Sequence, residues 1–347
     1  MANRYRRVLV AFMSYRDDAE YDRDYEFTQA ELAQVTADDV ARYMNQKVYG
    51  TPTPMENDRP TLGRSNTLYD IKKALSFFMP NKLMTWDVIE CRGNPTRSAA
   101  VNDLIKRVKK FEARRQGAPS KARRALKEHE FRHVMSSLYQ TDHTDIVVKY
   151  GIPALLAFQF HMIGRLDDSS KWLRTNLQMH DSYPGKAAKA KLCWGKNVHE
   201  ERDAPWQHMF GCMDTVFCVL INIGLWLEIF HATVPDGRFR PFMFAFLDFP
   251  CTNPQEPTGE EMDDWAGKIK SKVYRELHRV MKNLTVAVED LIGTHSIRKM
   301  ASTWVRGNGV AKDDKDHRGR WAQKRISDIY DDVEFDYVDT KVAAVLC

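Results

Sequence analysis

The chain has 347 residues, of which 43% are hydrophobic and 29% are charged. This composition excludes a disordered chain, and the length allows two domains with a sizeable core. The net charge is only +5, so the chain as a whole is not strongly basic. The six cysteines are scattered without a Cys-x-x-Cys pair. This pattern argues against a disulfide framework or a zinc knuckle and predicts reduced thiols in an intracellular protein.

The first part of the chain predicts a small helical domain over residues 30–115. An N-terminal extension, residues 1–29, precedes it and has no clear hydrophobic period. A helix is expected from Thr36, which can cap it ahead of two acidic residues in the first turn. A second helix is expected over 65–79 and a third from Thr96, because apolar residues recur on one face of each.

A linker is predicted at residues 116–121, which contain Gly, Pro and Ser. It lies within a basic segment, residues 106–127, that holds ten Lys or Arg and one acid, Glu112. That segment carries +9 and leaves −4 on the rest of the chain, which is typical of a surface that contacts a polyanion. A solvated linker whose charges serve solubility is equally open. The candidate backbone-phosphate contacts are Lys106, Arg107, Lys109, Lys110, Arg114, Arg115, Lys121, Arg123 and Arg124.

The second part, residues 122–347, predicts a larger domain that is mainly helical with a small β-sheet (α+β). A helix is expected over 122–140. A strongly apolar helix over 145–164 leads directly into Arg165. Two short strands around a polar turn are expected over 188–210.

An apolar run at residues 210–232 raises the question of a membrane span. Three polar or charged residues interrupt the run: Asp214, Asn222 and Glu228. A charge at mid-bilayer costs about 3 kcal/mol or more, so a buried core helix is the better interpretation and no membrane contact is expected. A Pro-rich, aromatic insert at 239–261 predicts a long loop to which we assign no function.

The most specific pattern lies downstream of an amphipathic helix predicted over 263–284. His295 and Arg298 are three positions apart, so they share a face of the next predicted helix. Trp321 follows Arg298 by 23 positions, and Tyr330 follows Trp321 by nine. Each residue alone is common, but their joint spacing is specific.

A second group of residues lies upstream. Arg165 follows Ile163-Gly164 at the end of the apolar helix, and Asp168 comes three positions later. Lys196 lies in the predicted polar turn, whereas the rival lysines, Lys189 and Lys191, lie within a predicted strand. Together the two groups resemble the tyrosine recombinases, the phage-integrase family. The sequence segments GNPTRS and DDKDHRGRW are similar to those of eukaryotic mobile-element recombinases of the Crypton kind.

The resemblance implies that a tyrosine cleaves and rejoins DNA without a metal or another cofactor. It implies Tyr330 as the nucleophile, with Tyr337 as the less well spaced alternative, and Lys196 as the general acid. Arg165 and Arg298 would clamp the non-bridging oxygens of the scissile phosphate. The other implied roles are proton acceptance or phosphate hydrogen bonding by His295, donation from the indole of Trp321, and orientation of Arg165 or His295 by Asp168.

The resemblance also implies partners. Residues 30–115 would be a core-binding domain and residues 122–347 the catalytic domain, and the two would clamp double-stranded DNA. The tail after Tyr330 ends in an apolar VAAVLC, which in this family docks on a neighbouring protomer. The implied assembly is therefore a homotetramer on two DNA sites, although packing of the tail on its own chain is equally open. In a eukaryotic source a nuclear location is expected.

Two further functions remain in view. A type IB topoisomerase uses the same chemistry, although Trp321 and the short tail after Tyr330 favour a recombinase. A domesticated DNA-binding protein without catalytic activity would belong to another class. The presence of Arg165, Lys196, His295, Arg298 and Tyr330 together argues against such decay.

Overall fold

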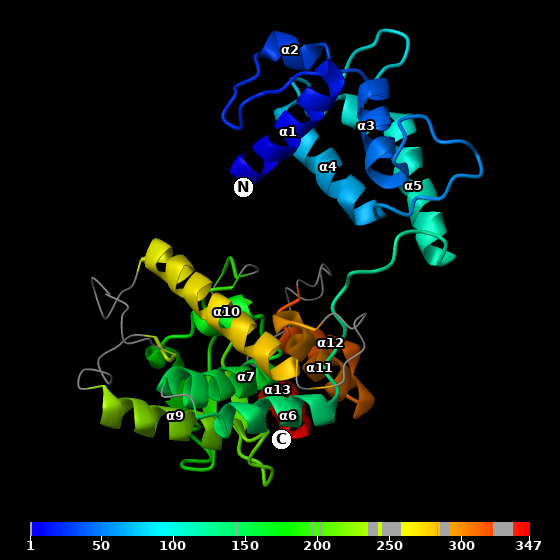
Figure 1. Ribbon diagram of the computed structural model, residues 1–347. Coiled ribbons are helices and arrows are strands. Elements are labelled where there is room, and N and C mark those ends of the chain that lie inside the picture. The colour runs from blue at the N-terminus through cyan, green and yellow to red at the C-terminus, as the bar shows by residue number, and fades with distance from the viewer. Residues whose placement is uncertain are drawn as a thin grey trace. The chain divides into compact units, whose positions relative to one another are not determined.

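The computed structural model of the chain describes residues 2–142, 145–195, 198–200, 203–234, 242–244, 258–282, 284, 292–321 and 336–347. The chain divides into two compact units, Met1–Lys121 and Ala122–Cys347 (Figure 1). Each unit has its own hydrophobic core.

The N-terminal unit is helical. Its elements are α1 (Ala2–Asp17), α2 (Gln29–Ala33), α3 (Ala37–Tyr49), α4 (Ser65–Phe78), the 3-10 turn η1 (Pro95–Arg97) and α5 (Ala99–Ala113). Although residues 1–29 were expected as an extension, α1 packs against α3 and α4, and Leu9, Phe12 and Met13 are buried in the core of this unit. Leu9, Phe12 and Met13 are spaced as one face of a helix, but they lie within the unbroken apolar run 8–13, which conceals that period in the sequence.

Local side-chain hydrogen bonds set the helix ends in this unit. Thr36 caps α3 as expected, because its hydroxyl accepts from the Asp39 N–H while the Asp39 carboxylate accepts from the Thr36 N–H. The third helix begins at Ala99 instead of Thr96. The Asn94 side chain accepts from the Thr96 N–H and holds a 3-10 turn there, and Ser98 then caps α5.

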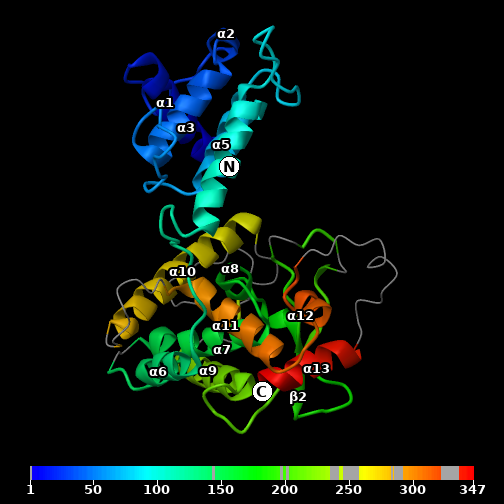
Figure 2. The ribbon, with the colours of Figure 1, turned by 90° about the vertical axis from the view of Figure 1, so that its right-hand side faces the viewer.

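The C-terminal unit is mainly helical with a small sheet, which confirms the expected fold class (Figure 2). Strands β1 (Leu177–Met179), β2 (Ala187–Ala190) and β3 (Gln207–Phe210) are antiparallel in the order β1-β2-β3, with Ala188 opposite Met209. The helical elements are α6 (Glu128–Tyr139), the π-turn η2 (Val147–Gly151), α7 (Ile152–His161), α8 (Leu166–Ser170), η3 (Arg174–Asn176), α9 (Val219–Thr233), α10 (Gly259–Met281), α11 (Thr294–Gly307), α12 (Lys312–Arg318) and α13 (Asp336–Leu346).

Helix α7 forms the centre of this unit, because every one of its residues is buried. Helices α6, α8, α9, α11 and α13 all contact it. The helix expected over 122–140 begins only at Glu128. The backbone before Glu128 is hydrogen-bonded to α11 instead, because the Leu126 N–H donates to the Ser296 carbonyl at 3.2 Å.

The helix expected in the apolar run at 210–232 is α9, which begins only at Val219, because Phe210 ends β3 and residues 211–218 are not helical. It buries one face in the core through Trp226 and Phe230 and exposes Ile221 and Leu225. Among the described residues, no helix is long and apolar enough to cross a membrane. Of the insert at 239–261, the structure describes residues 242–244 and 258–261. Met243 is buried, and its carbonyl accepts from the Trp226 indole at 2.8 Å.

A fully buried arginine, Arg318, joins four elements of the C-terminal unit. Its Nε and Nη2 donate to the His161 carbonyl at the end of α7, at 3.1 and 3.0 Å. Nη2 also donates to the His208 carbonyl of β3 at 2.7 Å, and Nη1 donates to the Asp339 carboxylate of α13 at 2.6 Å. This charge is therefore satisfied on every side.

Replacing Arg318 with Met should lower the free energy of unfolding of the C-terminal unit by about 3 kcal/mol or more, because it leaves the buried Asp339 carboxylate without its cation. The measurement is urea unfolding followed by the fluorescence of Trp172, Trp226 and Trp265, which are buried in this unit. The control is Lys312→Ala, which removes an exposed lysine that pairs with Asp316, while Asp316 keeps its pair with Lys315; this change should cost at most about 1 kcal/mol. Equal losses in both variants would contradict the structural role of Arg318.

Candidate functional site

Arg165 is presented by a strained reversal at the end of α7. Ile163 has a φ of 44°, which is uncommon for a β-branched residue. Gly164 follows, and a Cβ there would lie 2.5 Å from the Ser169 hydroxyl oxygen, so no larger residue fits without a shift. Arg165 then enters α8 with extended backbone angles. The turn therefore fixes where the Arg165 side chain leaves the chain.

A buried amide connects this turn to the His295 helix. Gln159 Nε2 donates to the Gly164 carbonyl at 3.3 Å and to the Thr294 carbonyl at 2.9 Å. Thr294 is the first residue of α11 and immediately precedes His295. The two predicted groups of site residues are thus held together by one side chain, although 135 positions separate Gln159 from Thr294.

Arg298 is the most enclosed of the predicted site residues on α11. Its side chain is 7% exposed. Nη2 donates to the Gly319 carbonyl at 2.6 Å, and the guanidinium lies over the Trp321 ring, 4.4 Å from its centroid. Burial and the nearby Arg165 lower the pKa of Arg298 to about 10, partly offset by Asp168. Arg298 therefore remains charged at neutral pH and is oriented before any ligand arrives.

His295 lies at the exposed edge of the same cluster. Partial desolvation lowers the pKa of His295, and repulsion lowers it further. The repelling groups are Arg123, Arg298, Arg165 and Lys299. Because the pKa is displaced downward from 6.5, the ring is mainly neutral at pH 7 and can accept a proton or a hydrogen bond.

Asp168 is a buried carboxyl group among these cations, and it is only 4% exposed. Arg165 Nη1 lies 3.9 Å from Asp168 Oδ2. Within the described part of the chain, Oδ1 of this carboxyl is buried without a hydrogen-bond partner. The structure thus brings together Arg165, Asp168, His295, Arg298 and Trp321, as the sequence pattern predicts, and their roles remain predictions.

Lys196 and Tyr330 lie outside the described residues. Gly195, just before Lys196, approaches Asp168 closely, because a Cβ on it would lie 3.6 Å from the carboxyl carbon. The rival Lys189 on β2 is ion-paired with Asp181 at 2.6 Å. Lys191 lies beside the Trp206 ring, 5.9 Å from its centroid. The rival nucleophile Tyr337 falls in α13, where its side chain is not among those described.

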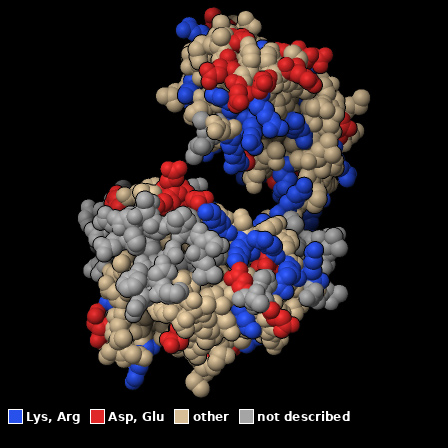
Figure 3. All heavy atoms as spheres, turned by 60° about the vertical axis from the view of Figure 1, so that its left-hand side comes forward, with Lys and Arg blue, Asp and Glu red and all other residues tan. Residues whose placement is uncertain are grey.

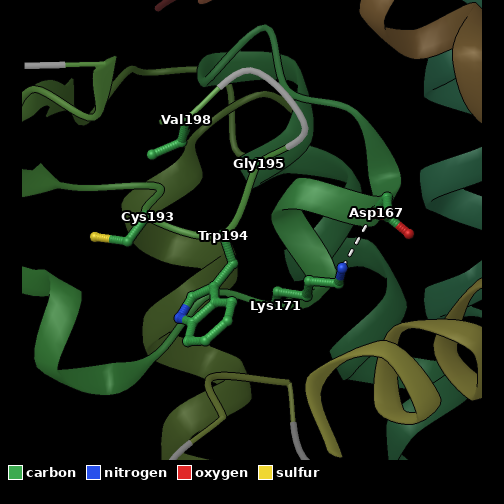
Figure 4. Close-up of a pocket in the computed structure, with 6 residues that line it drawn as sticks. All are labelled: Asp167, Lys171, Cys193, Trp194, Gly195 and Val198. Atoms are coloured by element: carbon green, nitrogen blue, oxygen red, sulfur yellow. Dashed lines mark ion pairs between the residues drawn. The ribbon is translucent and has the colours of Figure 1, made fainter. Parts of the chain in front are cut away.

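A pocket of about 670 Å³ lies beside Gly195 (Figure 4). Its lining residues are Asp167, Lys171, Cys193, Trp194, Gly195 and Val198. Asp167 is held between Lys171 at 3.3 Å and Lys270 at 2.5 Å. The pocket therefore adjoins Gly195, and none of the arginines of the cluster is among its lining residues.

The basic segment is exposed where it belongs to α5, and Figure 3 shows Lys and Arg gathered on the surface of each unit. Its single acid, Glu112, turns inward, where it accepts from the Ser65 N–H and pairs with Arg64 at 3.0 Å. Two of the predicted backbone-phosphate contacts, Arg124 and Arg123, lie close to other side chains of the protein. Arg124 makes a two-pronged ion pair with Glu130, and Arg123 is close enough to His295 to affect its pKa.

Sequence reasoning missed two residues of the cluster, Gln159 and Arg320. Gln159 lies inside a uniformly apolar run, and Arg320 is one of several cations around Trp321, so neither carries a local signal. Among the described residues, no group of three His, Cys, Asp or Glu side chains could hold a metal ion.

No protein-family model and no curated protein matches the chain. Solved structures similar to it are those of tyrosine recombinases. XerH site-specific recombinase bound to palindromic difH substrate, in a post-cleavage complex, is 11% identical with a TM-score of 0.48, covering 96% of this chain and 76% of that chain. A lambda integrase tetramer bound to a Holliday junction is 12% identical with a TM-score of 0.44, and the match covers 95% of this chain and 76% of that chain. A lambda integrase(75-356) dimer bound to a COC' core site is 12% identical with a TM-score of 0.43, and the match covers 96% of this chain and 97% of that chain. At these identities and scores, the likeness places no individual side chain, and the case for a function rests on the cluster described above.

Replacing Arg123 with Gln should raise the pKa of His295 toward 6.5, because one of the repelling cations is removed. The measurement is an NMR titration of the imidazole signals, with the His295 signal assigned from a His295→Gln sample. Arg132→Gln is the control, since Arg132 on α6 pairs with Glu128 and Asp214 and should leave this pKa unchanged. A His295 pKa insensitive to Arg123 would contradict the cationic setting of the ring.

Proposed function

We propose that the chain is a site-specific DNA recombinase of the tyrosine type, which cleaves and rejoins DNA through a 3′-phosphotyrosyl intermediate. The observation that supports this proposal most strongly is the cluster in which Arg165 lies beside Asp168, Arg298 lies over Trp321, and both arginines are near His295. These residues come from segments far apart in the sequence, and their order and spacing are those of the resemblance. A transposase of a mobile element, in the nucleus of a eukaryotic source, is the finer form of the proposal.

In the proposed reaction, the Tyr330 oxygen attacks the scissile phosphorus and the bond from phosphorus to the 5′ oxygen breaks. His295 takes the phenol proton, and Lys196 donates a proton to the leaving oxygen. Arg165 and Arg298 bind the non-bridging oxygens, on which negative charge grows in the transition state. The guanidinium groups supply the positive charge that metal ions supply in other nucleases, so the proposed reaction requires no metal.

The preorganisation of Arg298 supports its role in this scheme. The Trp321 ring and the Gly319 carbonyl already hold its guanidinium, so little side-chain entropy is lost when phosphate binds. The neutral state of His295 at pH 7 suits a proton acceptor, and the surrounding cations that keep it neutral also attract the phosphate backbone.

The proposed partner is duplex DNA, bound by both units and contacted along the backbone by the basic segment. The proposed assembly is a homotetramer on two DNA sites. In the single chain, α13 packs on α11, α12 and β3, with Val342, Ala343 and Leu346 buried. A tail exchanged between protomers would fill the same surface on a neighbouring chain.

Covalent trapping tests the chemistry. The protein is incubated with a randomised, nicked duplex library, in which loss of the short strand prevents religation, and adducts that survive SDS are measured without added metal. We expect an adduct that is lost in Tyr330→Phe and kept in Tyr337→Phe. Arg298→Ala should reduce the trapping rate by about 100-fold or more, as expected for loss of a charged donor at the transition state.

The outcomes separate the alternative functions. Tight, salt-dependent DNA binding without an adduct would favour the silent DNA-binding protein. An adduct together with relaxation of supercoiled plasmid, but without strand exchange between two sites, would favour the topoisomerase. The absence of both DNA binding and an adduct would contradict the proposal.

The basic segment should contribute to affinity through counterion release. Replacing Lys109 and Lys110 of α5 with Gln should reduce the slope of log K against log salt by roughly 0.9 for each phosphate that is no longer neutralised. The measurement is fluorescence anisotropy with duplex DNA over a range of salt concentrations. Arg23→Gln, between two acidic residues in the exposed 21–25 loop, is the control. An unchanged slope in the double variant would favour the solvated-linker interpretation.

A further inference from the structure

We propose that Arg320 is a positioning residue of the same site, which holds the turn that presents Arg165 and adds a third fixed positive charge to a site for a phosphate-type oxyanion. This inference rests on the proposed function where it concerns DNA cleavage. Its binding component can be tested without DNA.

The backbone at Arg320 is in an unfavourable conformation for an arginine. Its φ is 52°, in the left-handed region that favours glycine. The neighbouring glycine, Gly319, has a φ of −78° and does not need glycine's conformational freedom. Gly319 is needed for space instead, because a Cβ there would overlap the Trp321 ring. The residue in the strained position is thus the arginine, and such strain persists where the surrounding structure holds it.

The contacts of Arg320 show what holds it. Nη1 donates to the Gln207 side-chain oxygen at 2.5 Å and to the Arg318 carbonyl at 3.3 Å. Nη2 donates to the Met162 carbonyl at 3.4 Å. Met162 immediately precedes the strained Ile163 and lies three residues before Arg165. Arg320 therefore ties β3 and the segment after α12 to the turn that presents Arg165.

The charges around Arg320 point to an anionic ligand. Burial lowers the pKa of Arg320 to about 10; Asp168 opposes this shift, while Arg298, Arg318 and Arg165 add to it. Arg165 Nη1 lies 3.9 Å from the Asp168 carboxylate, and the charge of Asp168 acts on both Arg298 and Arg320. The three guanidinium groups repel one another, and a bound oxyanion would relieve this repulsion. A phosphodiester that gains charge as it is attacked has this chemistry.

The experiment compares Arg320→Gly, Arg320→Lys and the control Arg132→Gln with the unchanged chain. Glycine accepts the left-handed backbone, which offsets part of the stability lost with the three hydrogen bonds of Arg320, so Arg320→Gly should remain folded. Binding of inorganic phosphate, measured by calorimetry at constant ionic strength, should weaken at least tenfold in Arg320→Gly and less in Arg320→Lys, which retains a charge. Arg132→Gln should bind phosphate like the unchanged chain.

The second readout is the rate of adduct formation at saturating nicked DNA. We expect this rate to fall at least tenfold in Arg320→Gly, with DNA affinity changed less than twofold, because contacts outside the cluster remain. If Arg320→Gly does not fold, Arg320→Lys supports the same comparison, with smaller losses in both readouts. Phosphate binding absent from the unchanged chain, or phosphate affinity and adduct rate both unchanged in the variants, would overturn the inference. Phosphate binding that depends on Arg320 in a chain that forms no adduct would instead overturn only the proposed recombinase chemistry and leave the oxyanion site standing.

Discussion

The position of the candidate site depends on the buried guanidinium of Arg318. Three of its bonds end on the backbone carbonyls of His161 and His208, and the fourth interaction is with Asp339. The His161 carbonyl belongs to the last turn of α7, where the helix dipole favours a cation. The segments that carry the site leave from these fixed points, since Arg165 follows His161 by four residues and Trp321 follows Arg318 by three. Arg318, to which no ligand is assigned, thus sets the positions of the residues that are proposed to bind phosphate.

The arginines of this unit divide by the way their charge is satisfied. Arg318 directs its donors to carbonyls and a carboxylate, so it is complete without a ligand. Arg165 has Asp168 at a long 3.9 Å, and Arg298 has an aromatic face and one carbonyl. Such partners orient a guanidinium without neutralising it. Burying cations in this state lowers stability, and this cost is understandable where an anion is to be bound.

The sequence predicted those features that depend on neighbouring residues or on a fixed spacing. The Thr36 cap, the apolar helix before Arg165 and the two short strands expected over 188–210 belong to this group. Features set by distant backbone were not predictable. The chain before Glu128 is extended because Leu126 pairs with Ser296, and Gln159 acts through Thr294, 135 positions away. Arg320 looks like any other basic residue until its backbone angle and its contact with the α7 turn are known.

Two arginines of the C-terminal unit hold described residues on either side of positions 322–335, the interval that contains Tyr330 in the sequence. Trp321 lies against Arg298, and Asp339, in the first turn of α13, is held by Arg318. Thirty-eight positions of sequence separate Arg298 from Asp336, yet α11 and α13 pack together. The contacts of α13 with α11 and of Asp339 with Arg318 therefore bring the residues after this interval back to the domain that carries Arg298.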